Sequence, residues 1–121
     1  MATTQKTPLP IEEIALIAAQ KIQRFTAGMT LIDFMANEIV QSAVIRELQV
    51  IGKAAHILMM DDTRTTHIGS NWQVIAGMYD QLLYKYFAVS NEIVWTTVQS
   101  NIPPLIAQLE QYVSPDSGTA K

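Results

Sequence analysis

The chain has 121 residues, of which 49% are hydrophobic and 16% charged, with no cysteine and a formal net charge of -3. Its length suits one domain with a real core, and the absence of cysteine excludes disulfides, thiol nucleophiles and thiolate metal sites. No segment resembles a signal peptide, no apolar run reaches about 18 residues, and no overall basic field would attract nucleic acid or a membrane, so we expect one cytoplasmic domain.

The low charge content also bears on assembly. Typical soluble domains have roughly 25% charged residues, whereas this chain has 16% and a positive mean hydropathy. We therefore expect apolar surface on the monomer, which self-association into a homodimer would cover.

The N-terminal half is predicted to be helical. Apolar residues in the segment 10–27 fall within one stripe at about 100° per residue, and Gly28 suits the left-handed position after a helix. Thr30 with Asp33 predicts a short capped helix in TLIDFMA. Asn37 is then placed to cap a second long helix.

This second long helix, residues 38–60, is apolar over most of its circumference, which predicts a central place in a helical bundle. Its polar residues gather in one strip, which consists of Ser42, Arg46, Gln49, Lys53 and His56. Glu47 is the exception, because its helical angle falls among apolar residues, where a carboxylate needs a partner.

The segment 61–71, DDTRTTHIGSN, is polar and rich in turn-forming residues, so it reads as a linker. Its last residues, Ser70 or Asn71, can cap a third long helix over 72–87. Ser90 can likewise cap a fourth helix.

The fourth helix has Ile93, Val94 and Val98 as its apolar members. Pro103 and Pro104 interrupt the pattern that follows, so PPLIAQLEQYV is either a kinked continuation or a short separate helix.

No strand or hairpin pattern appears anywhere in the sequence. The prediction is therefore an all-α, up-and-down bundle of four to five helices that forms a dimer. We expect the domain to span residues 10–113, between a disordered N-terminus over 1–9 and a disordered tail over 114–121.

The usual signs of a metal or cofactor site are missing. His56 and His67 are the only histidines, and no metal-ligand spacing surrounds them. Asp61 and Asp62 lie close to Arg64, which favours a solvated helix end over a cation site. No glycine-rich phosphate loop or nucleophile elbow occurs, so we predict neither a metal nor a cofactor.

The segment IAGMYDQLLYKYF, residues 75–87, concentrates three tyrosines on one expected helix. Tyr79 and Tyr86 nearly superpose, whereas Tyr84 lies about 140° from Tyr79, so one helix face cannot present all three. Their hydroxyl groups need buried partners, access to solvent or a dimer interface.

Several separated segments in order resemble the HepT-like group of HEPN domains. They are RFTAGMTLIDF, QSAVIRELQVIGKAA, WQVIAGM and YFAVSNEIVWTTVQSNIPPL, and the resemblance covers about residues 11–109. It implies a small helical protein, the toxin half of a toxin-antitoxin system whose antitoxin is a minimal nucleotidyltransferase. Active members of this group are described as metal-independent RNases.

The family signature places an arginine, four residues, a histidine, one residue and a tyrosine directly after IAGM. The resemblance assigns acid/base chemistry to this histidine and phosphate stabilisation to this arginine. Here Tyr79 and Tyr84 occupy the arginine and histidine positions, and only Tyr86 matches. The first hypothesis is therefore a catalytically degenerate protein that acts as a dimeric partner of the nucleotidyltransferase.

Other positions also depart from the family pattern. Glu47 and Asp80 replace asparagines, Lys53 replaces a carboxylate, and Lys85 stands where aspartate is frequent. The two added acids would repel phosphate, and the two lysines would offset them.

Two further hypotheses stay open. The first is an RNase whose altered site uses Arg46, His56 and Lys85. The second is a nucleotide- or RNA-binding module without turnover. The resemblance also makes Tyr86 a candidate acceptor of AMP from the nucleotidyltransferase, which would add phosphate charge to the site.

Overall fold

A computed structural model of the chain describes residues 11–60 and 90–119. This part of the chain is helical and contains no strand, which confirms the all-α prediction. Its helices are α1 (Ile11–Thr26), α2 (Leu31–Met35), α3 (Glu38–Met59), α6 (Asn91–Ser100) and α7 (Ile102–Thr119). The predicted helix over 72–87 and the N-terminal segment 1–9 lie outside the described residues.

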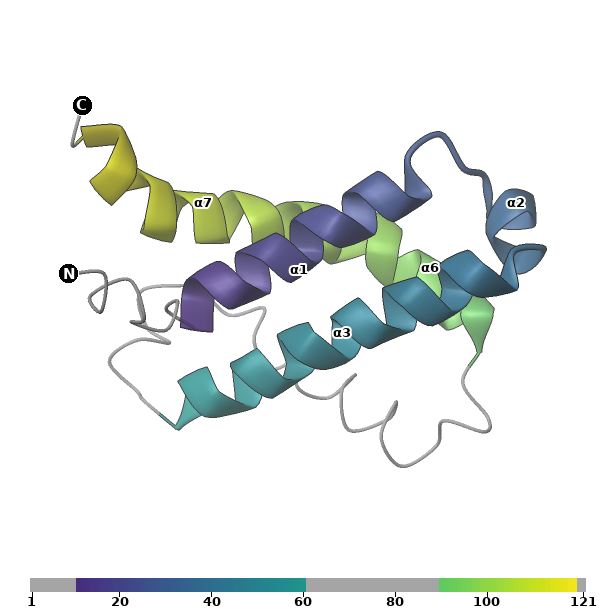
Figure 1. Cartoon of the computed structure of the whole chain (residues 1–121), viewed down its shortest axis with the longest axis horizontal. Coiled ribbons are helices and arrows are strands. Elements are labelled where there is room, and N and C mark those ends of the chain that lie inside the picture. Colours follow the sequence, from purple (N-terminus) through teal and green to yellow (C-terminus); the bar gives the residue numbers. More distant parts are fainter. Residues whose placement is uncertain (1–10, 61–89, 120–121) are drawn as a thin grey trace, which may run out of the picture.

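The helices pack as a bundle around α1 (Figure 1). α1 contacts α3 on one side and α7 on another, and α6 contacts α7. The short helix α2 lies at one end of the bundle, where it contacts both α3 and α6. α1 and α3 run in opposite directions, because only the α2 corner connects them.

The hydrophobic core lies between these helices. Ala15 and Ala19 of α1 are completely buried, and their small side chains permit close packing of the neighbouring helices. Larger apolar side chains from all the helices fill the core, including Leu16, Ile22, Phe34, Val44, Leu48, Ile51, Leu58, Val94, Val98, Ile102, Leu105 and Leu109. Burial of these side chains supplies the main driving force for folding.

Local capping explains where the helices begin. The Thr30 Oγ1 atom accepts a hydrogen bond from the Asp33 backbone N–H at 3.1 Å, and Asp33 Oδ2 accepts one from the Thr30 N–H at 3.0 Å. This reciprocal capping box confirms the prediction for α2. Asn37 caps α3 and Ser90 caps α6, also as predicted. Gly28 has a φ of 76°, the left-handed conformation expected after α1.

α2 is also tied to α3 by a side chain. The Gln41 Nε2 group of α3 donates hydrogen bonds to the backbone carbonyls of Phe34 at 2.8 Å and Met35 at 3.0 Å. These carbonyls belong to the last turn of α2, and the Phe34 carbonyl also accepts a hydrogen bond from the Asn37 N–H at 3.2 Å. The corner between α1 and α3 is therefore held by both capping and side-chain hydrogen bonds.

One feature of the C-terminal part differs from expectation. Val94 and Val98 are buried as predicted, but Ile93 is 55% exposed. α7 is a separate helix, as one of the two interpretations had it. Its two prolines lie in the first turn, where a missing N–H costs no intrahelical hydrogen bond.

α7 continues to Thr119. Extending an existing helix is much easier than nucleating one. The domain bounds of 10–113 stay a prediction.

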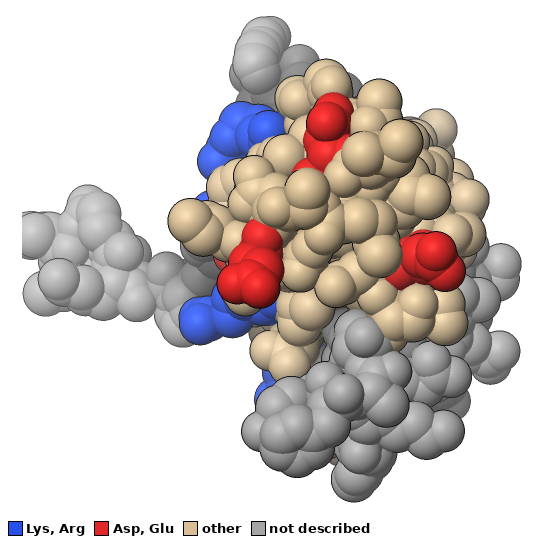
Figure 2. All heavy atoms as spheres, turned by 90° about the vertical axis from the view of Figure 1, so that its right-hand side faces the viewer, with Lys and Arg blue, Asp and Glu red and all other residues tan. Residues whose placement is uncertain are grey.

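Apolar side chains are exposed at the α2 end of the bundle. Ile32 is 79% exposed and Ile39 is 82% exposed, and Leu31, Met35 and Ile93 are also exposed. The view onto this end shows few charged side chains among the described residues (Figure 2). The expectation of exposed apolar surface is confirmed, while the homodimer stays a prediction. Among the described helices, none combines the length and apolar character needed to cross a membrane.

Candidate functional site

Most residues of the motif proposed from sequence lie outside the described part of the chain. These are Tyr79, Tyr84, Lys85 and Tyr86. Arg46 is described: it lies on α3 and its side chain is exposed. Of the candidate residues named from the sequence, the structure describes Arg46 and His56, both on α3.

Arg46 lies in a groove between α1 and α3. A cavity of about 450 Å³ occupies one part of it, lined by Ile11, Ile14, Arg46, Gln49, Val50, Lys53, Ala54 and Ile57. An adjoining cavity of about 260 Å³ is lined by Ile14, Ile17, Ala18, Lys21, Arg46, Glu47 and Val50. Ile14, Arg46 and Val50 line both, so the two cavities form one continuous surface, here called the α1–α3 groove.

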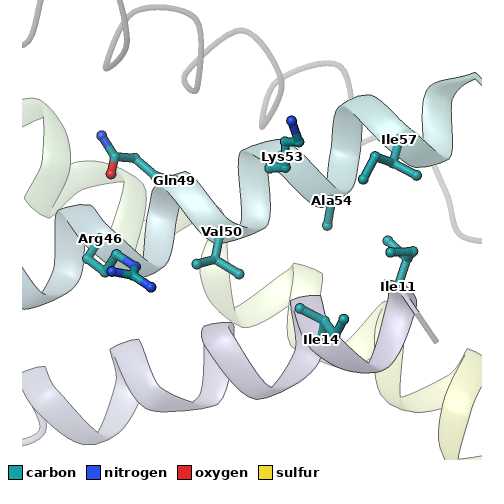
Figure 3. A pocket seen from close by; sticks show the side chains of 8 residues that line it. All are labelled: Ile11, Ile14, Arg46, Gln49, Val50, Lys53, Ala54 and Ile57. Carbon is teal, nitrogen blue, oxygen red and sulfur yellow. The ribbon is translucent and has the colours of Figure 1, made fainter. Parts of the chain in front are cut away.

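The floor of the α1–α3 groove is aliphatic (Figure 3). Ile11 and Ile14 project from α1 toward α3, and Val50, Ala54 and Ile57 lie on the facing side of α3. The helical spacing of these residues explains the arrangement, because positions three, four and seven apart share one face.

Cationic side chains border this floor. The Arg46 guanidinium lies at one end, and Lys53 and Gln49 extend from the side of α3 that is turned away from α1 (Figure 3). Lys21 approaches from α1 in the second cavity. In the described part of the chain, Arg46, Lys53 and Lys21 form no ion pair.

The basic residues are unevenly distributed over the fold. All Lys and Arg residues within the described ranges lie on α1 or α3, and α2, α6 and α7 contain none. In the view onto the α2 end, the blue side chains lie along one side of the molecule (Figure 2). The α1–α3 side is thus locally basic although the whole chain has a net charge of -3.

Glu47 is the carboxylate whose helical angle led us to expect a partner. It is half-buried and lines the second cavity together with Lys21 and Arg46. Neither cation forms an ion pair with it within residues 11–60 and 90–119. Its position at the groove gives the carboxylate access to solvent, so full burial is avoided.

One buried carboxylate was missed by the sequence reasoning. Glu12 is only 1% exposed, although it lies in the first turn of α1. An acid in a first turn usually reads as a favourable partner of the helix dipole. Its spacing of three and seven residues from the buried Ala15 and Ala19 was the available sign that it faces the core.

Comparison with known proteins supports the resemblance over most of the chain. Residues 15–112 match the ribonuclease HepT-like family. A provisionally named RNase from Caldanaerobacter subterraneus subsp. tengcongensis is 33% identical over 106 residues, which cover 88% of this chain and 94% of the relative.

A second relative, named "Probable ribonuclease HepT", comes from Thermococcus cleftensis. It is 35% identical over 101 residues, which cover 84% of this chain and 90% of the relative. No solved structure gives a significant match to the chain. The family match and both alignments extend over most of the chain. The chain therefore belongs to the ribonuclease HepT-like family.

Proposed function

We propose that this chain is a catalytically degenerate member of the family, and that it acts as a dimeric binding partner of a minimal nucleotidyltransferase in a toxin-antitoxin system. The observation that carries the proposal is the sequence YDQLLYKY after IAGM. It has Tyr79 and Tyr84 where the family signature has an arginine and a histidine.

The two replacements remove different parts of the chemistry. A phenol with a pKa near 10 is a poor general base at neutral pH. An imidazole is a better one, because its pKa lies close to neutral pH. Loss of positioned acid/base catalysis lowers a reaction rate by about 10² to 10⁴. Tyr79 also provides no fixed positive charge for the phosphoryl group in the transition state.

The described surface supports a role in binding. Apolar side chains are exposed at the α2 end, and the α1–α3 groove offers an aliphatic floor with cations beside it. Exposed apolar surface of this kind is typical of sites of protein association. A scaffold that keeps such surfaces remains able to bind after its catalytic groups have changed.

RNA cleavage by an altered site is the second candidate function. The relatives' names associate this family with ribonucleases, and Arg46 is an exposed cation without an ion pair in the described residues. Such a site would combine Arg46 with His56 and Lys85. A module that binds nucleotide or RNA without turnover is the third candidate.

Co-expression with a minimal nucleotidyltransferase tests the proposed partnership. We expect the two proteins to co-purify, and incubation with ATP to add the mass of AMP to Tyr86. In that reaction the phenol oxygen forms a bond to the α-phosphorus, and pyrophosphate leaves. Intact-mass spectrometry should detect the addition in the wild-type chain and not in Tyr86→Phe. Absence of both the complex and the mass addition would contradict the partnership.

A further inference from the structure

We propose that the α1–α3 groove is the docking site for an acidic amphipathic helix of the partner protein. This inference rests on the proposed binding function and names the surface and the chemistry of the contact. It involves none of the motif positions. Three properties of the groove carry it, namely its length, its aliphatic floor and its charge.

The groove is about as long as a short helix. Its lining runs from Ile11 to Lys21 on α1 and from Arg46 to Ile57 on α3. At a rise of 1.5 Å per residue, each side is about 15 Å long, which corresponds to roughly three helical turns. Two parallel walls of this length form a cradle for a third helix laid along them.

The floor is suited to the apolar stripe of such a helix. Ile17 and Ile57 are still 38% and 37% exposed, although each lines the groove. Val50 lies between the two cavities and is half-buried. A docked helix would remove these aliphatic side chains from water, which is the favourable term in helix-in-groove recognition.

The charges bordering the groove select an acidic helix. Lys21, Arg46 and Lys53 line it together with a single carboxylate, Glu47, and within the described residues none of the three cations forms an ion pair. Arg46 and Lys53 are two helical turns apart, about 10 Å along the axis. Asp or Glu residues on the flank of a docked helix that lies along α3 would therefore find two cations at this spacing.

The same lining is poorly suited to single-stranded RNA. Bases bind to such proteins largely by stacking on aromatic side chains, and neither cavity has an aromatic residue in its lining. Glu47 would also repel a phosphate backbone that followed the groove. Aliphatic side chains with flanking cations fit an amphipathic protein helix better.

A labelled synthetic peptide tests this docking with the full chain. The probe has about 15 residues, enough to span the groove as a helix, with Leu at helical spacing and Glu on both flanks. Fluorescence anisotropy should show saturable binding of this peptide and little binding of a permuted peptide with the same composition. Equal binding of the two peptides would overturn the proposal.

Charge reversal identifies the groove as the binding surface. We expect Arg46→Glu/Lys53→Glu to weaken peptide binding about tenfold or more, because two attractive contacts become repulsive. Arg24→Glu is the control for a charge reversal outside the groove, since Arg24 is an exposed cation of α1 that lines neither cavity. The doubly reversed chain should instead bind a peptide with Lys in place of Glu. The same loss in the Arg24→Glu control, or no loss in the double variant, would contradict groove binding.

The floor is tested separately from the charges. Ile17→Ser should weaken binding of the acidic peptide, whereas Ile39→Ser should not, because Ile39 is exposed outside the groove. Unchanged circular-dichroism spectra and unfolding midpoints would establish that both variants keep the fold. Equal affinities of the two variants would overturn the assignment of the aliphatic floor.

Two other occupants of the α1–α3 groove, a small anion and a second copy of this chain, would give different results in these assays. Displacement of the peptide by AMP would identify a small-anion site, and a change of sedimentation in Arg46→Glu/Lys53→Glu would identify an interface between copies of this chain. Either result would overturn the peptide-docking proposal.

The proposed function is judged separately. If the nucleotidyltransferase still co-purifies with Arg46→Glu/Lys53→Glu, the docking site is wrong and the partnership stands. If the peptide binds but no nucleotidyltransferase co-purifies with the wild-type chain, the partnership fails instead.

Discussion

Replacement of Phe34 by alanine is expected to lower the free energy of unfolding by about 3 to 5 kcal/mol. Phe34 is completely buried, and its ring centroid lies 5.3 Å from that of Trp95, with an angle of 38° between the ring planes. It is the buried residue of α2, whereas Trp95 belongs to α6. Truncation would leave a cavity where the α2 corner meets the rest of the bundle, and chemical denaturation followed by circular dichroism measures the loss.

Two variants on the same helix control this experiment. Phe34→Leu retains much of the buried volume and should cost less than Phe34→Ala. Ile32→Ala should change the unfolding free energy by no more than about 0.5 kcal/mol, because Ile32 is 79% exposed. A loss below about 1 kcal/mol for Phe34→Ala would contradict the position of its ring in the core.

Restoring the family motif is expected to produce the largest change in activity. The double variant Tyr79→Arg/Tyr84→His supplies a guanidinium for the phosphate and an imidazole for proton transfer. We expect its rate of RNA cleavage to exceed that of the wild-type chain by about 10² to 10⁴, the range that general acid/base catalysis contributes. A labelled RNA incubated with excess protein, without added metal, gives this rate.

A closely matched variant separates chemistry from binding. Tyr79→Arg/Tyr84→Phe adds the same positive charge but no acid/base group, so its gain should be smaller than that of Tyr79→Arg/Tyr84→His by the share that proton transfer contributes. Equal gains in both variants would show that the added positive charge, and not restored proton transfer, causes the increase. No gain in Tyr79→Arg/Tyr84→His would show that the two replaced residues do not account for the loss of catalysis.

The helices were predictable where local chemistry determines their ends. Thr30 with Asp33, Asn37 and Ser90 are caps whose hydrogen bonds reach only three residues along the chain. Gly28 follows α1 in the conformation that favours glycine. Such signals depend on neighbouring residues, so a single sequence contains them.

Features that depend on tertiary packing were harder to predict. Ile93 shares an apolar pattern with Val94 and Val98, yet it is exposed because no described helix covers its side of α6. Glu12 is buried for the opposite reason, since its side of α1 faces the core. A helical pattern identifies faces but does not state which neighbour covers each of them.

In the candidate site, too, some features follow from local sequence and others from tertiary packing. The motif positions are defined by the sequence alone, because Tyr79, Tyr84 and Tyr86 follow IAGM in a fixed order. The α1–α3 groove could be identified only from the folded structure, because folding brings Lys21 of α1 beside Arg46 of α3. The polar strip of α3 predicted that Arg46 and Lys53 share a face, but not the aliphatic floor beside them.

RNA cleavage by the purified wild-type chain tests the central claim, the loss of catalysis, most directly. The measurement follows a labelled RNA under single-turnover conditions and compares the wild-type chain with Tyr84→Ala and Lys85→Ala. We expect all three proteins to leave the RNA as intact as buffer alone does. Cleavage by the wild-type chain that either substitution abolishes would contradict the loss of catalysis and establish an active ribonuclease with an altered site.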